Sequence, residues 1–120
     1  MEAKHRLSVA VNMIARAMEA NDLETILTAK DGFYAALLDG AGNPDLSSML
    51  QLLHVRIRIL RRYSLSAAGR HAHSLAEIKA IVAAIVSGDV EAAGRAARHH
   101  AAQARNAALP HIFAEQFVAA

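Results

Sequence analysis

Apolar side chains recur at helical spacing along almost the whole of this 120-residue chain. In the first clear example, Leu7, Val11, Ile14 and Met18 share one face of an α-helix. The alternation of apolar and polar residues that marks a β-strand is nowhere sustained. A chain with this pattern must bury helical stripes against one another, which predicts an all-α antiparallel helical bundle of five to six helices.

Capping signals divide the chain into helices. The sequence predicts long helices at about 2–20, 23–39, 44–63, 74–88 and 89–109. Pro110 is expected to kink or to restart a short last helix that carries Ile112, Phe113 and Phe117. The start signals are Asp22, Asn43–Pro44 and Asp89, which are residues suited to the first turn of a helix. Ser74 and Glu77 have the spacing of a capping box, so the fourth helix is expected to begin at Ser74 after a loop.

The composition indicates one folded domain that covers residues 1–120. Hydrophobic residues make up 54% and aromatic residues only 4%, so Leu, Ile, Val and Ala are expected to form the core. Cysteine is absent, which excludes disulfides and thiolate metal sites. Because neither a signal peptide nor an apolar run of membrane-spanning length is present, a cytoplasmic protein without membrane contact is expected.

The charge pattern argues against direct nucleic-acid binding, since the formal net charge is only +2. Residues 46–75 contain no Asp or Glu and include Arg56, Arg58, Arg61, Arg62 and Arg70. Yet the segment has few aromatics and no helix-turn-helix signature. These cations are expected to form a solvated face, or to contact the acidic segment 19–45 of a partner.

The third predicted helix, 44–63, is apolar over so wide an arc that it is expected to be largely buried. At about 100° per residue, Arg56 falls between its two apolar faces. A cation inside an apolar arc is costly unless paired, and Arg suits a bidentate grip on a carboxylate. Arg56 is therefore a candidate anchor for an acidic ligand. The alternatives are an ion pair with a core or interface carboxylate, or a side chain that reaches out to water.

Two groups of residues occur in a characteristic order. The first is FYAAL at 33–37, followed by GNP at 42–44 and a Leu-rich helix. The second is SLAE at 74–77, followed by Ile81, Ala84–Ile85, Gly88–Asp89 and His99–His100. From about Leu7 to Ala108, the chain resembles the FadR C-terminal domain (FCD) of GntR-family transcriptional regulators.

The resemblance implies a dimeric bacterial regulator in which an N-terminal winged helix binds DNA and the C-terminal bundle binds a small effector, usually an organic acid. It also implies that the first long helix of the family bundle and the DNA-binding domain are absent from this chain. This chain is then not expected to contact DNA itself. Apolar surface left by the absent helix is expected to associate in a homodimer.

Many members of this family hold a divalent metal with one Asp and three His, a ligand set that suits Zn, Ni or Mn. The positions that correspond here are Lys30, Tyr34, Ile78 and His100. Only His100 matches, and Lys30 would place a cation where the charge of the metal should be. We therefore expect no metal at this site and no cofactor.

Tyr34 and His100 remain candidates for ligand contact. Tyr34 takes a position where metal-binding relatives place an inward ligand, so its hydroxyl is expected to reach the same cavity, or to pack at the core edge beside Phe33. His100 lies in a stripe of alanines, at positions 93, 96, 97 and 104. Such a stripe indicates either a cavity or close helix packing. The candidate ligand-binding residues are thus Arg56, Tyr34 and His100.

The sequence contains no arrangement of nucleophile and base, or of paired carboxylates, that would indicate an enzyme. The predicted function is that of a ligand-sensing and dimerisation domain that binds a small carboxylate inside the bundle. The alternative is a ligand-free dimerisation or protein-interaction module. A closed cavity with one or two polar anchors would favour the sensor.

Overall fold

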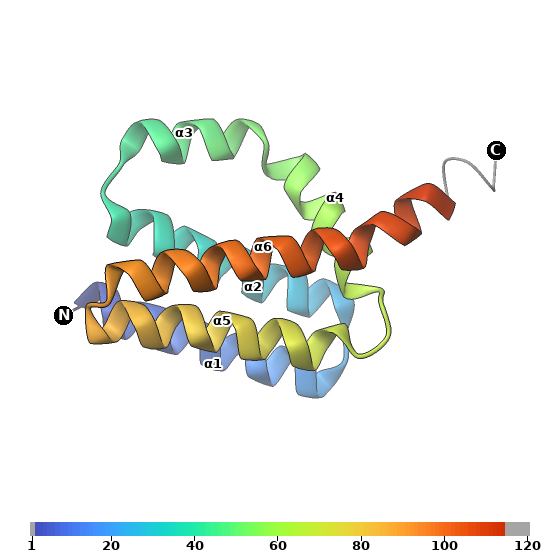
Figure 1. Cartoon of the computed structure of the whole chain (residues 1–120), viewed down its shortest axis with the longest axis horizontal. Helices are drawn as coiled ribbons and strands as arrows, with labels where there is room; N and C mark the ends of the chain where they lie inside the picture. The colour runs from blue at the N-terminus through green and yellow to red at the C-terminus, as the bar shows by residue number, and fades with distance from the viewer. Residues whose placement is uncertain (1, 115–120) are drawn as a thin grey trace.

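The computed structural model describes residues 2–114, which form six helices and no strand (Figure 1). The helices are α1 (Glu2–Ala20), α2 (Leu23–Ala41), α3 (Pro44–Leu52), α4 (His54–Leu65), α5 (Arg70–Ser87) and α6 (Val90–Phe113). The predicted all-α bundle is confirmed. Phe117, which was assigned to the last predicted helix, lies outside the described residues.

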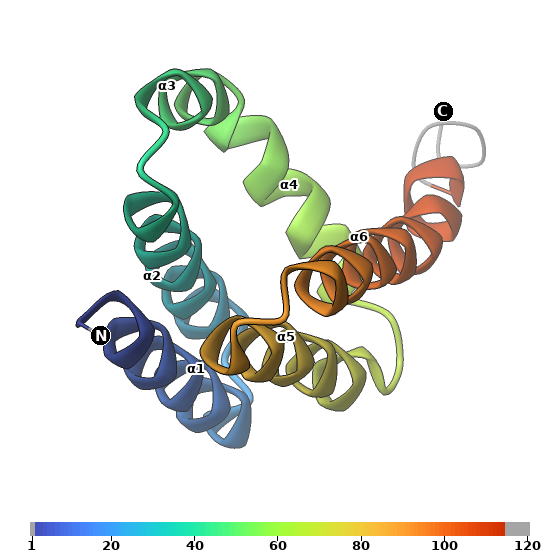
Figure 2. The same cartoon turned by 60° about the vertical axis from the view of Figure 1, so that its left-hand side comes forward.

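Four long helices form the body of the bundle, and α3 stands apart from it (Figure 2). α1 packs against α2, α5 packs against α6, and α1 also contacts α5, which joins the two pairs. α4 packs mainly against α6 and touches α2. Within the described part of the chain, α3 contacts only its sequence neighbours α2 and α4. The helices α2, α4 and α6 therefore pack on one another less closely than α1 packs on α2 or α5 on α6.

The core lies where the apolar stripes of α1, α2 and α5 meet. Its main cluster consists of Leu7, Val11, Ile14, Phe33, Ala36, Ile78 and Val82. A smaller cluster of Ala17, Ile26, Leu27 and Leu65 closes the end of the bundle at which α4 terminates. The stripe predicted for the first helix is thus buried, and aliphatic residues dominate both clusters because the chain has few aromatics.

The predicted helix caps are present at three starts. The side chains of Asp22, Asn43 and Asp89 each accept a hydrogen bond from the backbone N–H three residues on, at 3.3, 3.0 and 3.0 Å. Gly42 and Gly88 end α2 and α5 with left-handed backbone, at φ of 64° and 79°, where a residue with a Cβ would be strained. These caps set the lengths of α2 and α5, and so the position of their polar residues along the bundle.

The prediction of one long, buried helix over residues 44–63 was wrong. The helix breaks at Leu53, so α3 ends at Leu52 and α4 begins at His54. α3 buries none of its residues, and Leu52 and Val55 are 87% and 69% exposed. The break redirects the chain so that α4 packs on α6, while α3 is left on the outside. Neither Gly nor Pro marks the break in the sequence.

The predicted start of the fourth helix at Ser74 was also wrong. α5 begins one turn earlier, at Arg70, after Gly69 with a φ of 72°. Ser74 is fully buried inside the helix and accepts a hydrogen bond from Lys30 of α2. The Ser–Glu spacing that resembles a capping box instead places two polar side chains on the inner face of α5.

The last helix is longer than predicted. α6 does not restart at Pro110 but continues through it to Phe113. Pro110 lies near the end of the helix on its exposed side, where the missing N–H and the ring are tolerated. The extra turn carries Ile112 along the same side of the bundle as α4.

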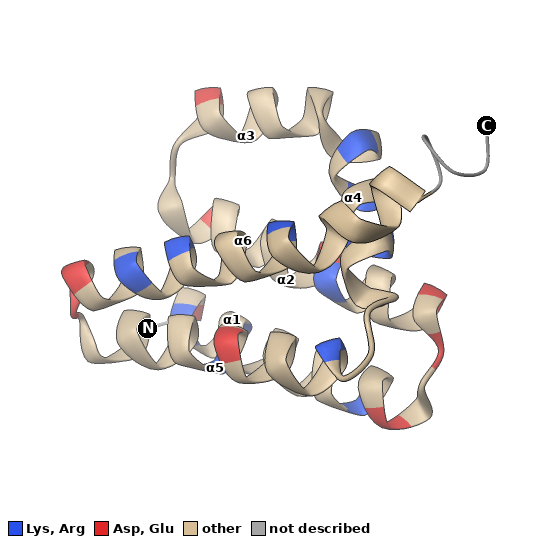
Figure 3. Ribbon diagram, turned by 45° about the vertical axis from the view of Figure 1, so that its right-hand side comes forward, with Lys and Arg blue, Asp and Glu red and all other residues tan. Residues whose placement is uncertain are grey.

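Three of the four arginines of α4 pair with carboxylates of α2 in the same chain. Arg58 forms ion pairs with Asp31 and Glu24, Arg61 pairs with Asp31, and Arg62 pairs with Glu24. These pairs fix α4 against α2, so the expected contact with an acidic segment occurs inside one molecule. Figure 3 shows the cations spread over several helices rather than gathered on one face. Between residues 2 and 114, no helix is long and apolar enough to cross a membrane.

Candidate ligand-binding cavity

A cavity of about 420 Å³ lies between α2, α4, α5 and α6. Most of its wall is apolar, and it is lined by Leu37, Ile57, Leu60, Ile81, Ala97, Ala101, Ala104, Ala108, Leu109 and Ile112. The polar lining residues are Lys30, Tyr34, Arg61, Ser64, His100 and Arg105. Two alanines of the predicted stripe, at positions 97 and 104, thus face a cavity. Its size and mixed lining are typical of sites for small molecules.

Tyr34 and His100 meet in this cavity. The Tyr34 hydroxyl lies 3.1 Å from Nε2 of His100, and Nδ1 of His100 lies 2.7 Å from Oε1 of Glu77. Burial lowers the pKa of His100, although the hydrogen bond to Glu77 opposes this effect. Because burial also raises the pKa of Tyr34, the phenol keeps its proton. We therefore assign Nδ1–H as the donor to Glu77 and Nε2 as the acceptor from Tyr34.

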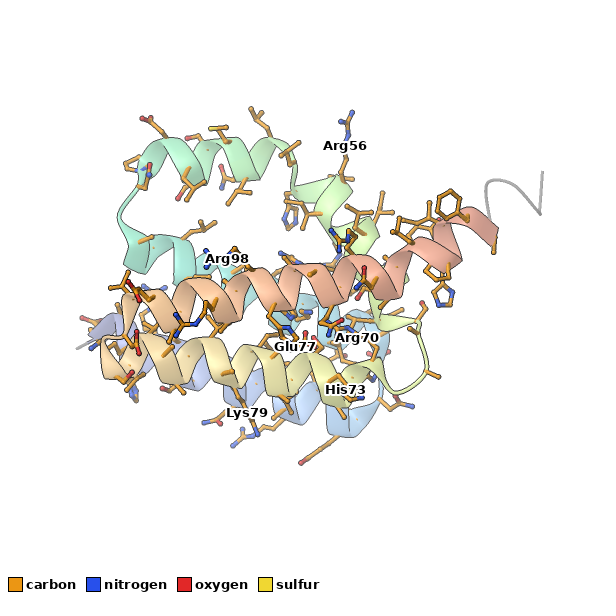
Figure 4. The ribbon with its side chains drawn as sticks, viewed as in Figure 1. Arg56, Arg70, His73, Glu77, Lys79 and Arg98 are labelled. Atoms are coloured by element: carbon orange, nitrogen blue, oxygen red, sulfur yellow. The ribbon has the colours of Figure 1, made fainter. Side chains whose placement is uncertain are left out.

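Glu77 of α5 supplies the carboxylate next to His100, and it binds two side chains, Arg70 and His100. Arg70 donates to both of its oxygens, at 2.8 and 2.7 Å, and His100 donates to Oε1 (Figure 4). Burial alone would raise the pKa of Glu77, but the hydrogen bonds from Arg70 and His100 outweigh it and hold that pKa below its ordinary value. The carboxylate is therefore ionised and its lone pairs are largely used.

Lys30 of α2 is a buried cation that no carboxylate partners. Its side chain is 3% exposed, and its Nζ donates to the Ser74 hydroxyl at 3.1 Å. Among residues 2–114, no Asp or Glu forms an ion pair with it. Burial lowers the pKa of Lys30 from 10.5 to about 7, and the positive charges of Arg61 and Arg70 add to this effect. The negative charge of Glu77 opposes this effect, but Lys30 lies at the cavity wall without a direct ion pair.

The arginine at the cavity is Arg61, not Arg56. The Arg61 guanidinium lies 3.9 Å from the centre of the Tyr34 ring, and its side chain is 17% exposed. Arg56 is exposed on α4 and points away from the bundle (Figure 4). The expected placement of Arg56 inside the bundle is therefore corrected. The cause is the break at Leu53, because the inward position predicted for Arg56 assumes one continuous helix over residues 44–63.

Tyr34 and His100 lie in one cavity, and several of their neighbours were not predicted. Glu77 and Arg70 are among these neighbours, although a spacing of seven residues is two helical turns and places both on one face. Lys30 stands four residues before Tyr34, which also implies a shared face. The spacing of residues within one helix does not show which residues of α4 and α5 face this part of α2.

The side chains at the positions that resemble a metal site do not fit a metal. Lys30 is a cation, and Ile78 is fully buried in the apolar core. Both ring nitrogens of His100 are engaged, by Glu77 and by Tyr34. In the described residues, no group of three or more His, Asp and Glu side chains is placed to hold a metal ion.

The family model of the FCD domain matches residues 2–103. The chain belongs to the FCD family. The resemblance seen in the sequence is confirmed, and FCD domains form the C-terminal domain of GntR-family transcription regulators, where they generally bind effectors and oligomerise. No curated protein and no solved structure matches the chain. The FCD match includes Lys30, Tyr34, Glu77 and His100 but ends before the last part of the cavity wall on α6.

The lowered pKa of Lys30 makes the stability of this FCD domain depend on pH. Between about pH 7 and 10.5 the unfolded chain protonates Lys30 more fully than the folded chain does. The free energy of unfolding therefore rises with pH in this window, by up to about 1.4 kcal/mol per pH unit from this group. We expect Lys30→Met to remove this rise between pH 7.5 and 9.5, as measured by urea unfolding at several pH values.

Lys79→Met is the matched control, because Lys79 is exposed on the outer side of α5 (Figure 4). It removes the same charge without changing the cavity and should leave the pH dependence as in the unaltered protein. The range stops at pH 9.5 because ionisation of Tyr34 in the unfolded chain opposes the effect near pH 10. Parallel pH curves for the two variants would contradict the burial of a charged Lys30.

Proposed function

We propose that this domain is the ligand-sensing and dimerisation part of a bacterial, cytoplasmic GntR/FadR-type regulator, and that it binds a small organic acid in the cavity. The observation that carries the proposal is the buried Lys30, which lines the cavity without a carboxylate partner. An unpaired charge in an apolar environment is costly, and a ligand carboxylate is the simplest partner that would offset the cost.

The groups around Lys30 support an anion rather than a cation as the ligand. Arg61 lies beside Tyr34 on one side of the cavity, whereas the carboxylate of Glu77 is already bonded to Arg70 and His100. Lys30 thus lines a largely apolar cavity in which none of the lining residues is an Asp or Glu. Tyr34 and His100 are proposed as neighbouring polar contacts that orient the ligand, since a hydroxyl and a ring nitrogen can each exchange partners.

We expect carboxylates to raise the melting temperature of the purified chain. A ligand at about 100 times its Kd stabilises the folded state by about 2.7 kcal/mol, which corresponds to a rise of several degrees for a domain of this size. The screen covers mono-, di- and hydroxycarboxylates and acyl thioesters, each with and without EDTA. Lys30→Met should weaken binding of the active acid at least tenfold, while EDTA has no effect.

Two exposed cations provide controls for this screen. Arg56→Ala and Lys79→Met each remove one charge from a side chain outside the cavity (Figure 4). Both variants should bind the acid as the unaltered protein does. Equal binding by Lys30→Met would show that the acid lies elsewhere, and a rise with added zinc alone would contradict the metal-free site.

Acid binding should weaken as the pH rises above 7. Lys30, with a pKa of about 7, must be protonated to hold a carboxylate, so Kd is expected to increase about tenfold per pH unit above that value. The other groups that face it are Arg61 of α4, Arg70 and Glu77 of α5 and His100 of α6.

These neighbours stay in one protonation state above pH 7. Glu77 has a lowered pKa, and His100 has a pKa lowered from 6.5. A guanidinium group is not deprotonated in proteins. Calorimetry in buffers of different ionisation enthalpy should therefore show about half a proton taken up at pH 7, and nearly one at pH 8.5. Acid binding without proton uptake at pH 8.5 would exclude Lys30 as the anchoring group.

A second observation favours association of two copies of the chain. An open groove of about 790 Å³ runs between α1 and α2, with Val9 and Met13 exposed in it. Its apolar lining includes Val9, Ala10, Met13, Ala17, Ala20, Ala29 and Ala36. The α1 side also carries Arg6 and Arg16, and the α2 side carries Glu24. Arg6 and Glu24 each already have an ion-pair partner within the chain, so the exposed apolar lining of the groove is what favours contact with a second copy.

We expect a homodimer at micromolar concentration in sedimentation velocity, and we expect Met13→Glu to dissociate it because a carboxylate would be buried in the groove. Met49→Glu is the matched control on α3, where the methionine is also exposed but lies outside the groove. Dissociation by Met49→Glu alone would move the interface to the apolar surface of α3. A monomer before any substitution would contradict the dimer.

A further inference from the structure

The lining of the cavity includes buried polar side chains and exposed apolar ones. Lys30, Ser64 and His100 are buried, at 3%, 4% and 6% exposure. Leu60 and Leu109 also line the cavity, and they are 50% and 39% exposed. These leucines come from α4 and α6, so the cavity opens between those helices. A ligand that reaches Lys30 therefore extends past apolar side chains on its way to the surface.

The deep end offers a positive charge for one anionic group. Arg61 is engaged by Asp31 at 3.3 Å, and Arg70 by Glu77. His100 has partners on both nitrogens. Among the basic residues that line the cavity, Lys30 alone is both buried and without a carboxylate. One carboxylate balances this charge, and a second one buried at the same depth would face no further cation.

The wall beyond Lys30 offers no comparable site for a second charge. α6 contributes alanines at positions 97, 101, 104 and 108, whose small side chains leave width for a ligand against the helix. Leu37, Ile57, Ile81 and Ile112 supply further apolar surface. The cation on this side, Arg105, is exposed, and its Nε donates to Asn106. Water screens a charge in that position, so it adds little to binding.

We propose that the ligand of this cavity is a monocarboxylate with an unbranched apolar tail. Its carboxylate lies on Lys30, and its tail runs along the alanines of α6 toward Leu60 and Leu109. This proposal rests on the proposed acid-binding function and narrows it to one chemical class. Polar hydroxy acids and dicarboxylates of similar length are thereby excluded as the preferred ligands, because their second polar group would be desolvated against an apolar wall.

The test compares straight-chain monocarboxylates, from butanoate to dodecanoate and below their micellar concentrations, with terminal dicarboxylates of matched length. Isothermal titration calorimetry at pH 7 gives Kd for each. Each added methylene is expected to lower Kd about three- to fourfold until the cavity is filled. Each dicarboxylate should bind at least tenfold more weakly than its monocarboxylate. A dicarboxylate that binds as tightly, or a Kd independent of chain length, overturns the proposal.

Ala104→Leu gives a second reading, because it adds bulk to the apolar wall and leaves Lys30 in place. We expect it to weaken the longer acids at least tenfold and to leave butanoate nearly unchanged. The matched control is Ala83→Leu, at an exposed position of α5 outside the cavity. Circular dichroism and thermal unfolding check that both variants fold. Equal loss for short and long acids in Ala104→Leu would show that the tail does not lie along α6.

The two proposals fail in different ways. If short acids bind and Lys30→Met abolishes their binding, acid recognition holds whatever the chain-length series shows. If those acids bind without any preference for an apolar tail, the monocarboxylate proposal alone is overturned. If no acid of any length binds, acid recognition in this cavity is overturned, and the monocarboxylate proposal with it.

Discussion

The carboxylate of Glu77 connects polar side chains of α5 and α6 beside the cavity. It lies on the inner face of α5, accepts two hydrogen bonds from Arg70 on the same helix and a third from His100 on α6. These bonds join the two helices that pack most closely in this half of the bundle. They occupy both oxygens of Glu77, which forms no hydrogen bond with Lys30, while Nε of Arg70 stays buried without a partner among the described residues. Lys30 thus lines the cavity without an ion pair.

Burial of the Lys30 amine lowers the stability of the folded chain, and a residue with only a structural role would not need to have this effect. A methionine of similar length would fill the same space without a buried ammonium group, and the lowered pKa measures how poorly the surroundings accept that charge. Folding tolerates the cost because Ser74 supplies one hydrogen bond and the apolar core below contributes the favourable free energy. A lysine that destabilises the empty protein can stabilise the complex, since an anionic ligand adds the missing partner and draws the proton onto the amine.

Much of the fold could be predicted from local rules, and the failures have physical causes. Asp22, Asn43 and Asp89 cap helices because each acts on the backbone of its own first turn, which the sequence alone specifies. The break at Leu53 has no such local origin. It allows α4 to pack on α6 and to place its arginines on the carboxylates of α2, so tertiary contacts decide it. The helix start predicted at Ser74 was wrong for a related reason. A Ser–Glu pair that suits a helix cap can equally point inward when the helix begins one turn earlier.

The candidate site was predictable as far as residues on one helix are concerned. Tyr34 and His100 followed from positions that correspond to metal ligands in the family, and the stripe of alanines on α6 also indicated His100. The choice between Arg56 and Arg61 depended on the rotation of a helix whose break the sequence does not show. In the sequence, Lys30 argues only against a metal at this site. In the structure, Lys30 also has a second interpretation, because a buried ammonium group presents the same sign of charge to the cavity as the metal ion of metal-binding relatives would. A pocket built in this way can attract an acid with a proton in place of a metal, and its affinity then depends on pH rather than on metal supply.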